Sequence, residues 1–317
     1  MTNWSDREID IDAIDCTDRS LAVTTTRSIE ALSCHIDRIG LLAPPILRNE
    51  NRHYRIVAGF RRIEACRMLQ WQRIPARVID ASESVCAEIA IADNTGHRTL
   101  NWIETARAYN LLRQHCSDDT ALLDRARSLG LAAGPDILRK TAALLALPQQ
   151  LQRWVEDDVL PMPMALELGR IHPAEDAVAL GELFWKLKLG LNRQRELLAY
   201  LSDIARRDRR TIGDILKDPE VTTILEDPTT DTPIKTNLLR RHLRRKRYPR
   251  ISAFEDRYHR NVQELRLPKG VNLVPPEHFE GPVWRMEIHF EKPDDFRKKI
   301  ESLQDILKNP VFWNLLT

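Results

Sequence analysis

The sequence contains few cysteines, few glycines and no long apolar run. Its 317 residues include five cysteines and eleven glycines, and 6% of the residues are aromatic. Because the cysteines are scattered and form no CxxC pair, we expect neither a disulfide framework nor a zinc site. No stretch approaches the roughly 18 apolar residues of a membrane span, and the acidic start, MTNWSDREIDIDAID, lacks the features of a signal peptide. We therefore expect a cytoplasmic protein without a membrane partner.

Positive charge is concentrated in one segment, although the formal net charge is only +2. Residues 235–260 contain ten Lys or Arg and two acidic residues. Such a block favours contact with nucleic-acid phosphates, because each neutralised phosphate releases counterions. A solvated helix, an acidic protein face and a membrane surface are the alternatives. The candidate DNA contacts in this block are Arg240, Arg241, Arg244, Arg245, Lys246 and Arg247.

Short strand and helix patterns alternate over the first hundred residues, which predicts a compact α/β domain over residues 1–100. The expected strands are residues 8–14, 44–48, 53–58 and 74–79, and the expected helices are residues 29–39, 61–69 and 83–92.

Helical periodicity begins at residue 101 and predicts a helical domain over residues 101–230. Three short helices with a glycine-containing turn predict a helix-turn-helix over residues 120–146. Its recognition helix begins at Pro135, a residue suited to the first helical turn. The candidate DNA contacts on this helix are Arg139, Lys140 and Thr141. Because the start of the helix is poor in polar residues, non-specific DNA contact is the alternative.

The last part of the chain has a different pattern. The segment DPTTDTP (227–233) predicts a linker and a domain boundary near residue 230. Alternating residues in 283–290 predict a half-buried strand, and a helix is expected from Pro293. The predicted fold class is therefore α+β and predominantly helical, with a basic segment and a small α+β domain over residues 231–317.

Two segments contain residues that suit phosphate chemistry. In the first, Gly59 ends a strand and Arg61 and Arg62 open the next helix, so free N–H groups and two cations could bind a phosphate. A strand-to-helix junction with surface arginines is the alternative. In the second, Asp93 and Asn94 offer oxygen ligands for Mg²⁺, and His97 and Arg98 follow closely enough to reach the phosphates. A solvated helix end is the alternative there.

These segments, taken in order, resemble the ParB family of chromosome and plasmid partition proteins. The resemblance extends over residues 8–200 and is carried by SIEALSCHIDRIGLL with APPILR, YRIVAGFRRIEACRMLQWQRIPARVI, ADNTGHRTLNWIETARAYNLL and LLALPQQLQRWVEDDVLPMPMAL. It implies a nucleotide-gated DNA clamp or adaptor that binds CTP and Mg²⁺, recognises double-stranded DNA and forms a homodimer associated with the nucleoid. It also implies a Walker-type ATPase partner, although the basic leader that contacts such a partner is absent here.

The resemblance assigns roles to individual residues. The GERRxRA box of the family falls on residues 59–65 and its ENxxR segment on residues 93–97. Asp93 and Asn94 would hold Mg²⁺ and, if the protein is a slow CTPase, would position the water that attacks the phosphate. The implied CTP-binding residues are Pro44, Gly59, Phe60, Arg61, Arg62, Ala65, Asn94, His97 and Arg98.

The sequence departs from the family pattern at several of these positions. Phe60 replaces a glutamate, Glu64 an arginine, Asp93 a glutamate and His97 an arginine. Two expected positive charges are missing, which favours CTP binding over efficient hydrolysis. Two other hypotheses stay open: a metal-dependent nuclease or small-molecule kinase on the same scaffold, and a nucleotide-independent helix-turn-helix repressor.

Overall fold

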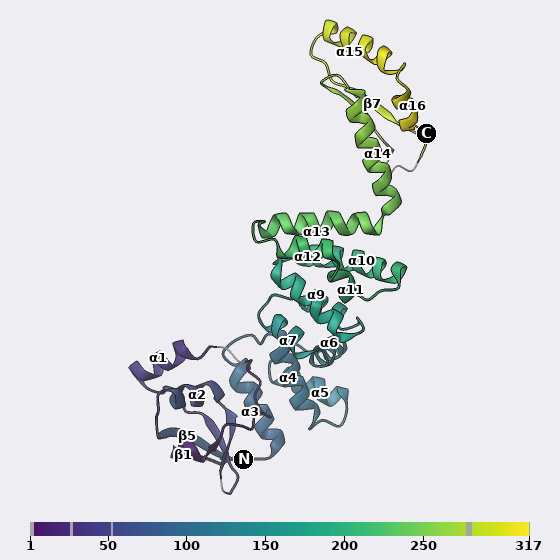
Figure 1. The fold of residues 1–317 in the computed structure, drawn as a ribbon. Helices are drawn as coiled ribbons and strands as arrows, with labels where there is room; N and C mark the ends of the chain where they lie inside the picture. The colour runs from purple at the N-terminus through teal and green to yellow at the C-terminus, as the bar shows by residue number, and fades with distance from the viewer. Residues whose placement is uncertain (1–2, 26–27, 52, 277–280, 317) are drawn as a thin grey trace. The chain divides into compact units, whose positions relative to one another are not determined.

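The computed structural model describes residues 3–25, 28–51, 53–276 and 281–316 (Figure 1). Its contacts divide the chain into two compact units, residues 1–194 and 195–317. Helices dominate, and two small sheets lie near the two ends of the chain. The predicted α+β, predominantly helical fold class is confirmed.

A five-stranded mixed sheet forms the base of the first unit, in the order β1-β5-β3-β4-β2. The strands are β1 (Asn3–Asp10), β2 (Ile14–Asp15), β3 (Ile46–Asn49), β4 (Tyr54–Ala58) and β5 (Arg73–Asp80). β1 pairs antiparallel with β5, and β3 pairs antiparallel with β4, whereas the β3–β5 and β2–β4 pairs are parallel. Alternation explains β5, in which Ile74, Ala76 and Val78 are buried.

The strand predicted at residues 8–14 is wrong beyond residue 10. The Asp10 carboxylate accepts a hydrogen bond from the Asp12 N–H and caps a short 3-10 helix, η1 (Ile11–Ala13). This local side-chain bond competes with strand pairing, as aspartate commonly does in turns. The apparent alternation of EIDIDAI therefore covers the end of one strand, a turn and the start of another.

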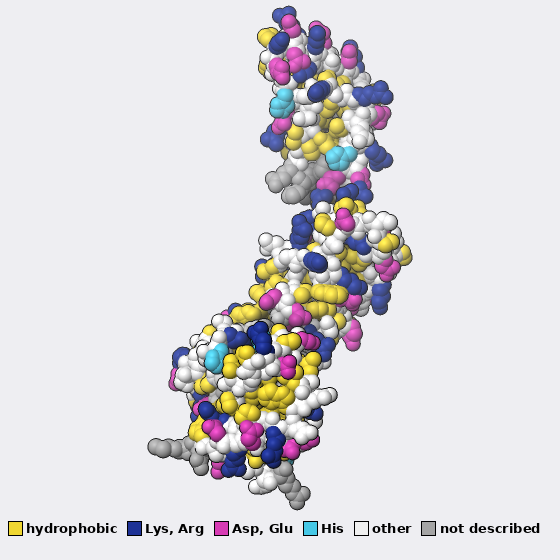
Figure 2. Space-filling view, turned by 90° about the vertical axis from the view of Figure 1, so that its left-hand side faces the viewer, with side chains coloured by type: hydrophobic (Ala, Val, Ile, Leu, Met, Phe, Trp, Pro, Cys, Tyr) yellow, Lys and Arg dark blue, Asp and Glu magenta, His cyan; other side chains and the backbone are white. Residues whose placement is uncertain are grey.

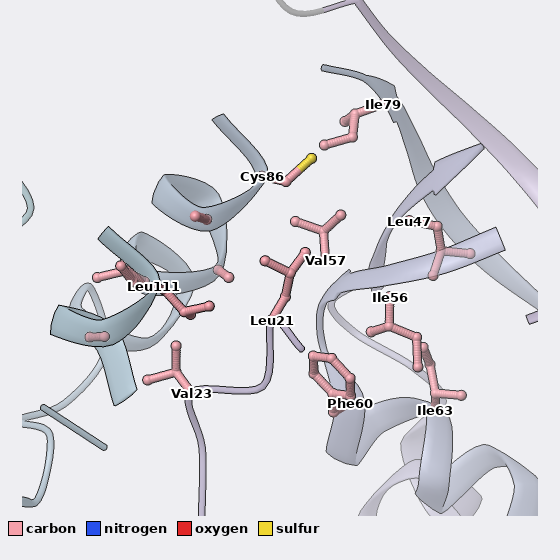
Figure 3. Packing of buried hydrophobic residues seen from close by; sticks show 14 of the residues in the cluster. Leu21, Val23, Leu47, Ile56, Val57, Phe60, Ile63, Ile79, Cys86 and Leu111 are labelled. Carbon is pink, nitrogen blue, oxygen red and sulfur yellow. The ribbon is translucent and has the colours of Figure 1, made fainter. Parts of the chain in front are cut away.

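Three helices accompany the sheet: α1 (Glu30–Ile39), α2 (Phe60–Met68) and α3 (Glu83–Thr95). Apolar side chains from α2, α3 and the strands meet in one core with Leu21 and Val23, which lie on the segment that precedes α1 (Figure 3). Leu111 of the next helix, α4 (Trp102–Arg113), also faces this core. The sheet and the first helices after it are therefore packed as one body.

The rest of the first unit is helical. The remaining helices are α5 (Asp119–Ser128), α6 (Pro135–Leu145), α7 (Gln149–Glu156), α8 (Met162–Leu168) and α9 (Ala174–Lys186). The turn between α5 and α6 contains Gly130 at φ +76°, a left-handed conformation that glycine adopts without strain. α4 packs against both helices. The arrangement of α4, α5 and α6 matches the predicted helix-turn-helix.

The second unit begins within α10 (Leu191–Asp208). It continues through α11 (Ile212–Leu216), α12 (Pro219–Glu226), α13 (Thr232–Arg247), α14 (Pro249–Leu265), β6 (Val271–Val274), β7 (Arg285–Ile288), α15 (Pro293–Ile306) and α16 (Pro310–Leu316). β6 and β7 form an antiparallel pair. A small core at the end of the unit contains Leu265, Leu273, Phe312 and Leu315.

The boundary between the units differs from the one expected near residue 230. The segment expected to be a linker is a short loop between α12 and α13, because α13 begins at Thr232. Val221 of α12 and Leu239 of α13 are fully buried, and the two helices pack together. The division into three functional domains, at residues 1–100, 101–230 and 231–317, stays a prediction. The packing of the chain defines two compact units.

Candidate functional site

The bend between β4 and α2 requires glycine. Gly59 has φ +93°, and a Cβ atom at this position would lie 2.9 Å from the Pro45 Cβ atom and 3.0 Å from Arg62 Nε. Both the backbone conformation and the close approach therefore exclude an ordinary side chain. The helix α2 begins directly after this bend, and the Gly59 carbonyl accepts hydrogen bonds from the N–H groups of Arg62 and Ile63.

Arg62 joins the two segments that the sequence singled out. Its Nη2 atom donates to Asp93 Oδ2 over 2.9 Å, and its Nη1 atom donates to the carbonyl oxygens of Ala43 at 3.1 Å and Pro44 at 3.3 Å. The Arg62 and Asp93 side chains are 20% and 24% exposed. The first turn of α2, the last turn of α3 and the loop at Pro44 therefore meet at one guanidinium.

The neighbouring polar residues have partners on the segment before α1. Arg61 Nη2 donates to the Ser28 carbonyl over 2.8 Å. Asn94 accepts a 2.7 Å hydrogen bond from the Thr24 hydroxyl, and its amide nitrogen donates to the Ala90 carbonyl. Asn94 therefore points toward Thr24, while Asp93 faces Arg62.

Arg98 lies against a buried carboxylate. It forms two hydrogen bonds with Glu104, of 2.5 and 2.8 Å, and Glu104 is 0% exposed. Glu104 also accepts hydrogen bonds from the backbone N–H groups of Thr25 and Asn101. Burial disfavours the charged carboxylate, but the hydrogen bonds from Arg98, Asn101 and Thr25 outweigh burial, so the pKa of Glu104 is lowered. Glu104 thus joins α4 to Arg98 and to the segment at Thr25.

Two residues implied by the resemblance are packed inside the domain. Phe60 is 9% exposed and points into the core toward Ile56 (Figure 3), and Ala65 is 0% exposed on α2. Neither side chain is placed to contact a ligand in this conformation, so their assignment stays a prediction that depends on the backbone at the start of α2. His97 lies in the exposed turn after α3.

Arg19 is a cation near this site that the sequence pattern did not reveal. Its Nη1 atom lies 2.6 Å from Glu64 Oε1, and its guanidinium lies 5.6 Å from the centre of the Phe60 ring. Glu64 stands where the family pattern has an arginine. Arg19, which precedes Glu64 by 45 residues in the sequence, places a positive charge beside that position. Complementary charge alone could not have identified this pair among the many possible ones.

The described residues contain no group of three or more His, Cys, Asp or Glu side chains arranged for a metal ion. At the candidate site Asp93 offers a carboxylate, and the oxygen of Asn94 is engaged by Thr24. Mg²⁺ commonly takes one or two carboxylates together with substrate phosphates. The Asp93 carboxylate fits that role, whereas Asn94 would first have to turn.

The recognition helix α6 presents two of its three candidate DNA contacts. Arg139 and Lys140 reach solvent, and both pair with Asp136, at 2.7 and 2.6 Å. Thr141 is 1% exposed and its hydroxyl donates to the Leu138 carbonyl. The structure therefore corrects Thr141, which faces the core because it lies on the apolar side of α6.

The six candidate DNA contacts of the basic block lie on α13, and five of them are paired. Arg244 pairs with Glu255 at 2.7 Å, and Arg245 pairs with Asp256 at 2.9 Å. Further pairs join Arg240 with Glu196, Lys246 with Asp218 and Glu220, and Arg247 with Asp203. Acidic residues of α10, α12 and α14 therefore neutralise much of the charge that the sequence concentrates here.

Comparison with known proteins identifies the first domain. Residues 2–95 match the ParB N-terminal domain family. Over these residues the chain is similar to the ParB N-terminal domain. The matched segment contains the Gly59 bend, Arg62 and Asp93, the residues that the geometry brings together.

Relatives of the chain extend beyond the ParB domain. The chain is 28% identical to a probable plasmid-partitioning protein ParB from Thermus thermophilus over 57% of its own length and 70% of the relative. It is 25% identical to a nucleoid occlusion protein from Bacillus pumilus over 78% of its length and 81% of that protein. A Bacillus subtilis nucleoid occlusion protein is 32% identical, over 41% of this chain and 45% of that one.

Two solved structures of ParB from Caulobacter crescentus are also similar. One, in complex with CTP-γ-S, is 26% identical over 57% of this chain and 98% of that chain, with a TM-score of 0.26. The other, bound to the centromeric parS site, is 24% identical over 60% of this chain and 97% of that chain, with a TM-score of 0.35.

Among the described residues, no helix is long and apolar enough to span a membrane.

Proposed function

We propose that this protein is a CTP-binding, DNA-binding clamp or adaptor of the partition and nucleoid occlusion type. The observation that carries the proposal is the Arg62–Asp93 contact of 2.9 Å, which joins the phosphate-binding bend to the Mg²⁺-binding segment. The ParB N-terminal domain match over residues 2–95 supports the same assignment. Among related proteins, one ParB was solved with CTP-γ-S.

Nucleotide binding would replace contacts within the chain. Arg61, Arg62 and Arg98 are each bonded to groups of the protein, so triphosphate oxygens would have to exchange with the Ser28 carbonyl, with Asp93 and with Glu104. Asp93, once released from Arg62, would be available to Mg²⁺. With one carboxylate available at the phosphates, we expect nucleotide binding with hydrolysis that is slow at most.

Calorimetric titration with CTP, ATP, GTP and UTP, each with and without Mg²⁺, tests this proposal. We expect Mg²⁺-dependent binding of CTP that the Arg62→Ala substitution abolishes. Arg67→Ala is the matched control, because Arg67 is exposed at the other end of the same helix. Equal affinity for all four nucleotides, or no binding of any of them, would contradict a CTP-gated clamp. That result would favour a nucleotide-independent helix-turn-helix repressor. Metal-dependent turnover of DNA or of a small acceptor would instead indicate an enzyme.

We propose that double-stranded DNA is bound by the recognition helix and by the basic block. Arg139 and Lys140 reach solvent on α6. Of the six candidate residues of the block, Arg241 of α13 is the one for which no ion pair is found among the described residues. The paired cations of the block can contribute only by exchanging a carboxylate for a phosphate. This exchange weakens their net contribution to DNA binding.

Fluorescence anisotropy of labelled DNA over a series of salt concentrations tests the two surfaces. The combined change of Arg244, Arg245 and Arg247 to glutamine should lower the slope of log K against log salt, by up to roughly 0.9 for each phosphate that is no longer neutralised. Changing Arg139 and Lys140 to glutamine should weaken binding on its own. An unchanged slope in the first variant would assign the block to a protein partner.

We propose that the protein forms a homodimer through the end of its second unit. Hydrophobic side chains gather on one face of this region, shown in the upper part of Figure 2. Met286 of β7 and Phe296 of α15 are 37% and 38% exposed, and Phe290 is 53% exposed. Sedimentation analysis should show a dimer that the Phe290→Asp substitution weakens.

We also propose that the protein is associated with the nucleoid and that it has a Walker-type ATPase partner. Imaging of the tagged protein tests the first expectation, and stimulation of ATPase activity tests the second.

A further inference from the structure

A cavity of about 340 Å³ lies in the first unit, next to the candidate nucleotide site. The segment 19–24, the helix α4 and the end of α6 form its wall. A volume of this size lies at the lower end of the roughly 300–1,000 Å³ typical of small-molecule pockets. Neither CTP binding nor DNA binding, as proposed for this chain, uses it.

The backbone explains which side chains reach the cavity. Leu21 and Val23 are buried and point into the core beside Leu111 (Figure 3). A turn closed by a 2.9 Å hydrogen bond from the Ala22 N–H to the Arg19 carbonyl contains Ser20 and Leu21. Leu21 lies on the core side of this turn, whereas Ser20 and Thr24 line the cavity. The opposite wall is one face of α4, whose residues at i, i+3 and i+4 are adjacent on a helix. These residues are Arg107, Asn110 and Leu111.

The polar lining of the cavity is cationic. Arg19 and Arg107 both line it, and no acidic residue is found among the described lining residues. Their carboxylate partners, Glu64 at 2.6 Å and Glu156 at 2.9 Å, are outside the lining. Each guanidinium has five N–H donors in a fork that matches oxyanions. Arg107 also donates to the Thr24 carbonyl over 3.3 Å. These contacts leave N–H donors on each arginine for a ligand.

We propose that this cavity is a second anion site, which binds a small phosphate-bearing ligand between Arg19 and Arg107. The Ser20 hydroxyl accepts a hydrogen bond from Arg55, and Asn110 lines the wall beside the two arginines. Thr24 also donates to Asn94, so the cavity adjoins the candidate nucleotide residues without including Arg62 or Asp93. The site rests on its own geometry and does not depend on CTP binding.

Calorimetric titration with inorganic pyrophosphate at constant ionic strength tests the site. The decisive pair of variants is Asn110→Asp and Asn110→Ala, because Asn110 is exposed and no hydrogen bond of its side chain is found among the described residues. The aspartate has nearly the shape of asparagine but places a negative charge in the wall. We expect Asn110→Asp to weaken pyrophosphate binding at least tenfold and Asn110→Ala to change it less than threefold.

The same titrations in an Arg62→Ala background separate this site from the nucleotide site. Pyrophosphate binding that survives Arg62→Ala and disappears with Asn110→Asp supports a second site, even if CTP never binds. Three outcomes would overturn it: no pyrophosphate binding at millimolar concentration, equal effects of the two Asn110 variants, or loss of CTP and pyrophosphate binding together in Asn110→Asp. Circular dichroism of each variant checks that the fold is retained.

Discussion

At the scale of single residues, Gly59 and Glu104 both stabilise the first unit, but for different physical reasons. Gly59 is required by backbone conformation and by close approach, whereas Glu104 is a buried charge fully surrounded by donors. An unpaired buried carboxylate would be costly, so the partners of Glu104 are as important as the carboxylate itself.

The Gly59→Ala substitution should destabilise the protein by about 2 kcal/mol or more, because it adds a clash with Pro45 to the strain of a positive φ. Gly130→Ala is the matched control: Gly130 also has a positive φ, but nothing lies within 4 Å of an added Cβ atom. Urea denaturation of both variants measures the difference. Equal losses would mean that the close approach to Pro45 has no effect.

The Glu104→Gln substitution should lower stability by about 2 kcal/mol near neutral pH, through weakened hydrogen bonds to a charged partner. The pKa of Glu104 is lowered by folding, so its contribution is present above the unfolded pKa of about 4.3 and is lost as the pH falls through the folded value. The gap between wild type and variant should therefore shrink below pH 4. Thermal denaturation from pH 3 to 7 tests this, and a gap independent of pH would contradict it.

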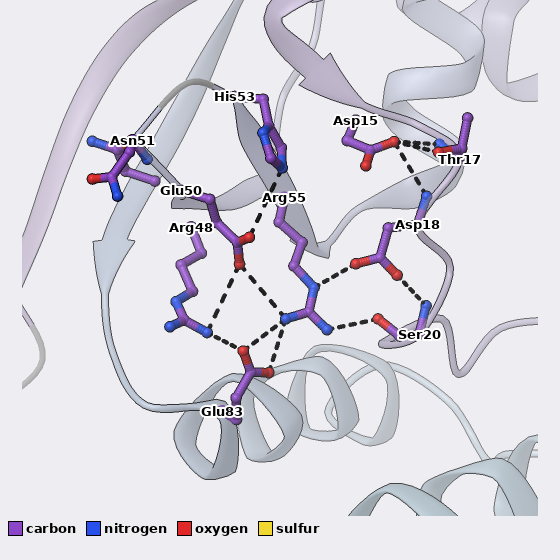
Figure 4. Close-up of polar contacts among 11 residues, drawn as sticks. Asp15, Thr17, Asp18, Ser20, Arg48, Glu50, Asn51, His53, Arg55 and Glu83 are labelled. Atoms are coloured by element: carbon purple, nitrogen blue, oxygen red, sulfur yellow. Dashed lines mark hydrogen bonds and ion pairs between the residues drawn. The ribbon is translucent and has the colours of Figure 1, made fainter.

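At the scale of elements, an ion-pair cluster fixes the β3–β4 hairpin to the start of α3 (Figure 4). Arg55 of β4 lies at its centre, paired with Asp18 at 2.6 Å and with Glu83 at 2.8 Å. Burial raises the pKa of Asp18 and Glu83, but hydrogen bonds to Ser20 and the charges of Arg55 and Arg48 outweigh it, so both pKa values are lowered. The cluster also joins the segment before α1 to the sheet.

Arg55→Met should therefore cost about 2 kcal/mol, because it leaves partly buried carboxylates without their cation. Arg127→Met, which removes an exposed pair with Asp124, should cost less than about 1 kcal/mol. Chemical denaturation at pH 7 compares the two. Because folding lowers both pKa values, the larger loss should decrease as the pH falls below the unfolded carboxylate pKa of about 4 and through the folded values. A loss that stays constant would argue for packing instead of charge.

At the scale of the whole molecule, the division of the chain into two compact units predicts two unfolding transitions. A saturating nucleotide at 100 times its Kd should stabilise the transition of residues 1–194 by about 2.7 kcal/mol and leave the other unchanged. Leu243→Ala, at a fully buried position of the second unit, should lower only the other transition. Scanning calorimetry tests both expectations. A single transition that both changes shift would show that the units unfold together.

The sequence by itself determined the alternation of elements, the fold class, the Gly59 bend and the helix-turn-helix, because periodicity, glycine and proline act over a few neighbouring residues. It also determined that Arg62 and Asp93 are candidates for one site. Only the tertiary structure decided that Phe60 and Thr141 face the core, that Arg19 lies beside Glu64, and that acidic residues from three helices neutralise the basic block. These outcomes depend on contacts between residues far apart in the chain, and a local pattern contains no information about which distant partner each side chain will meet.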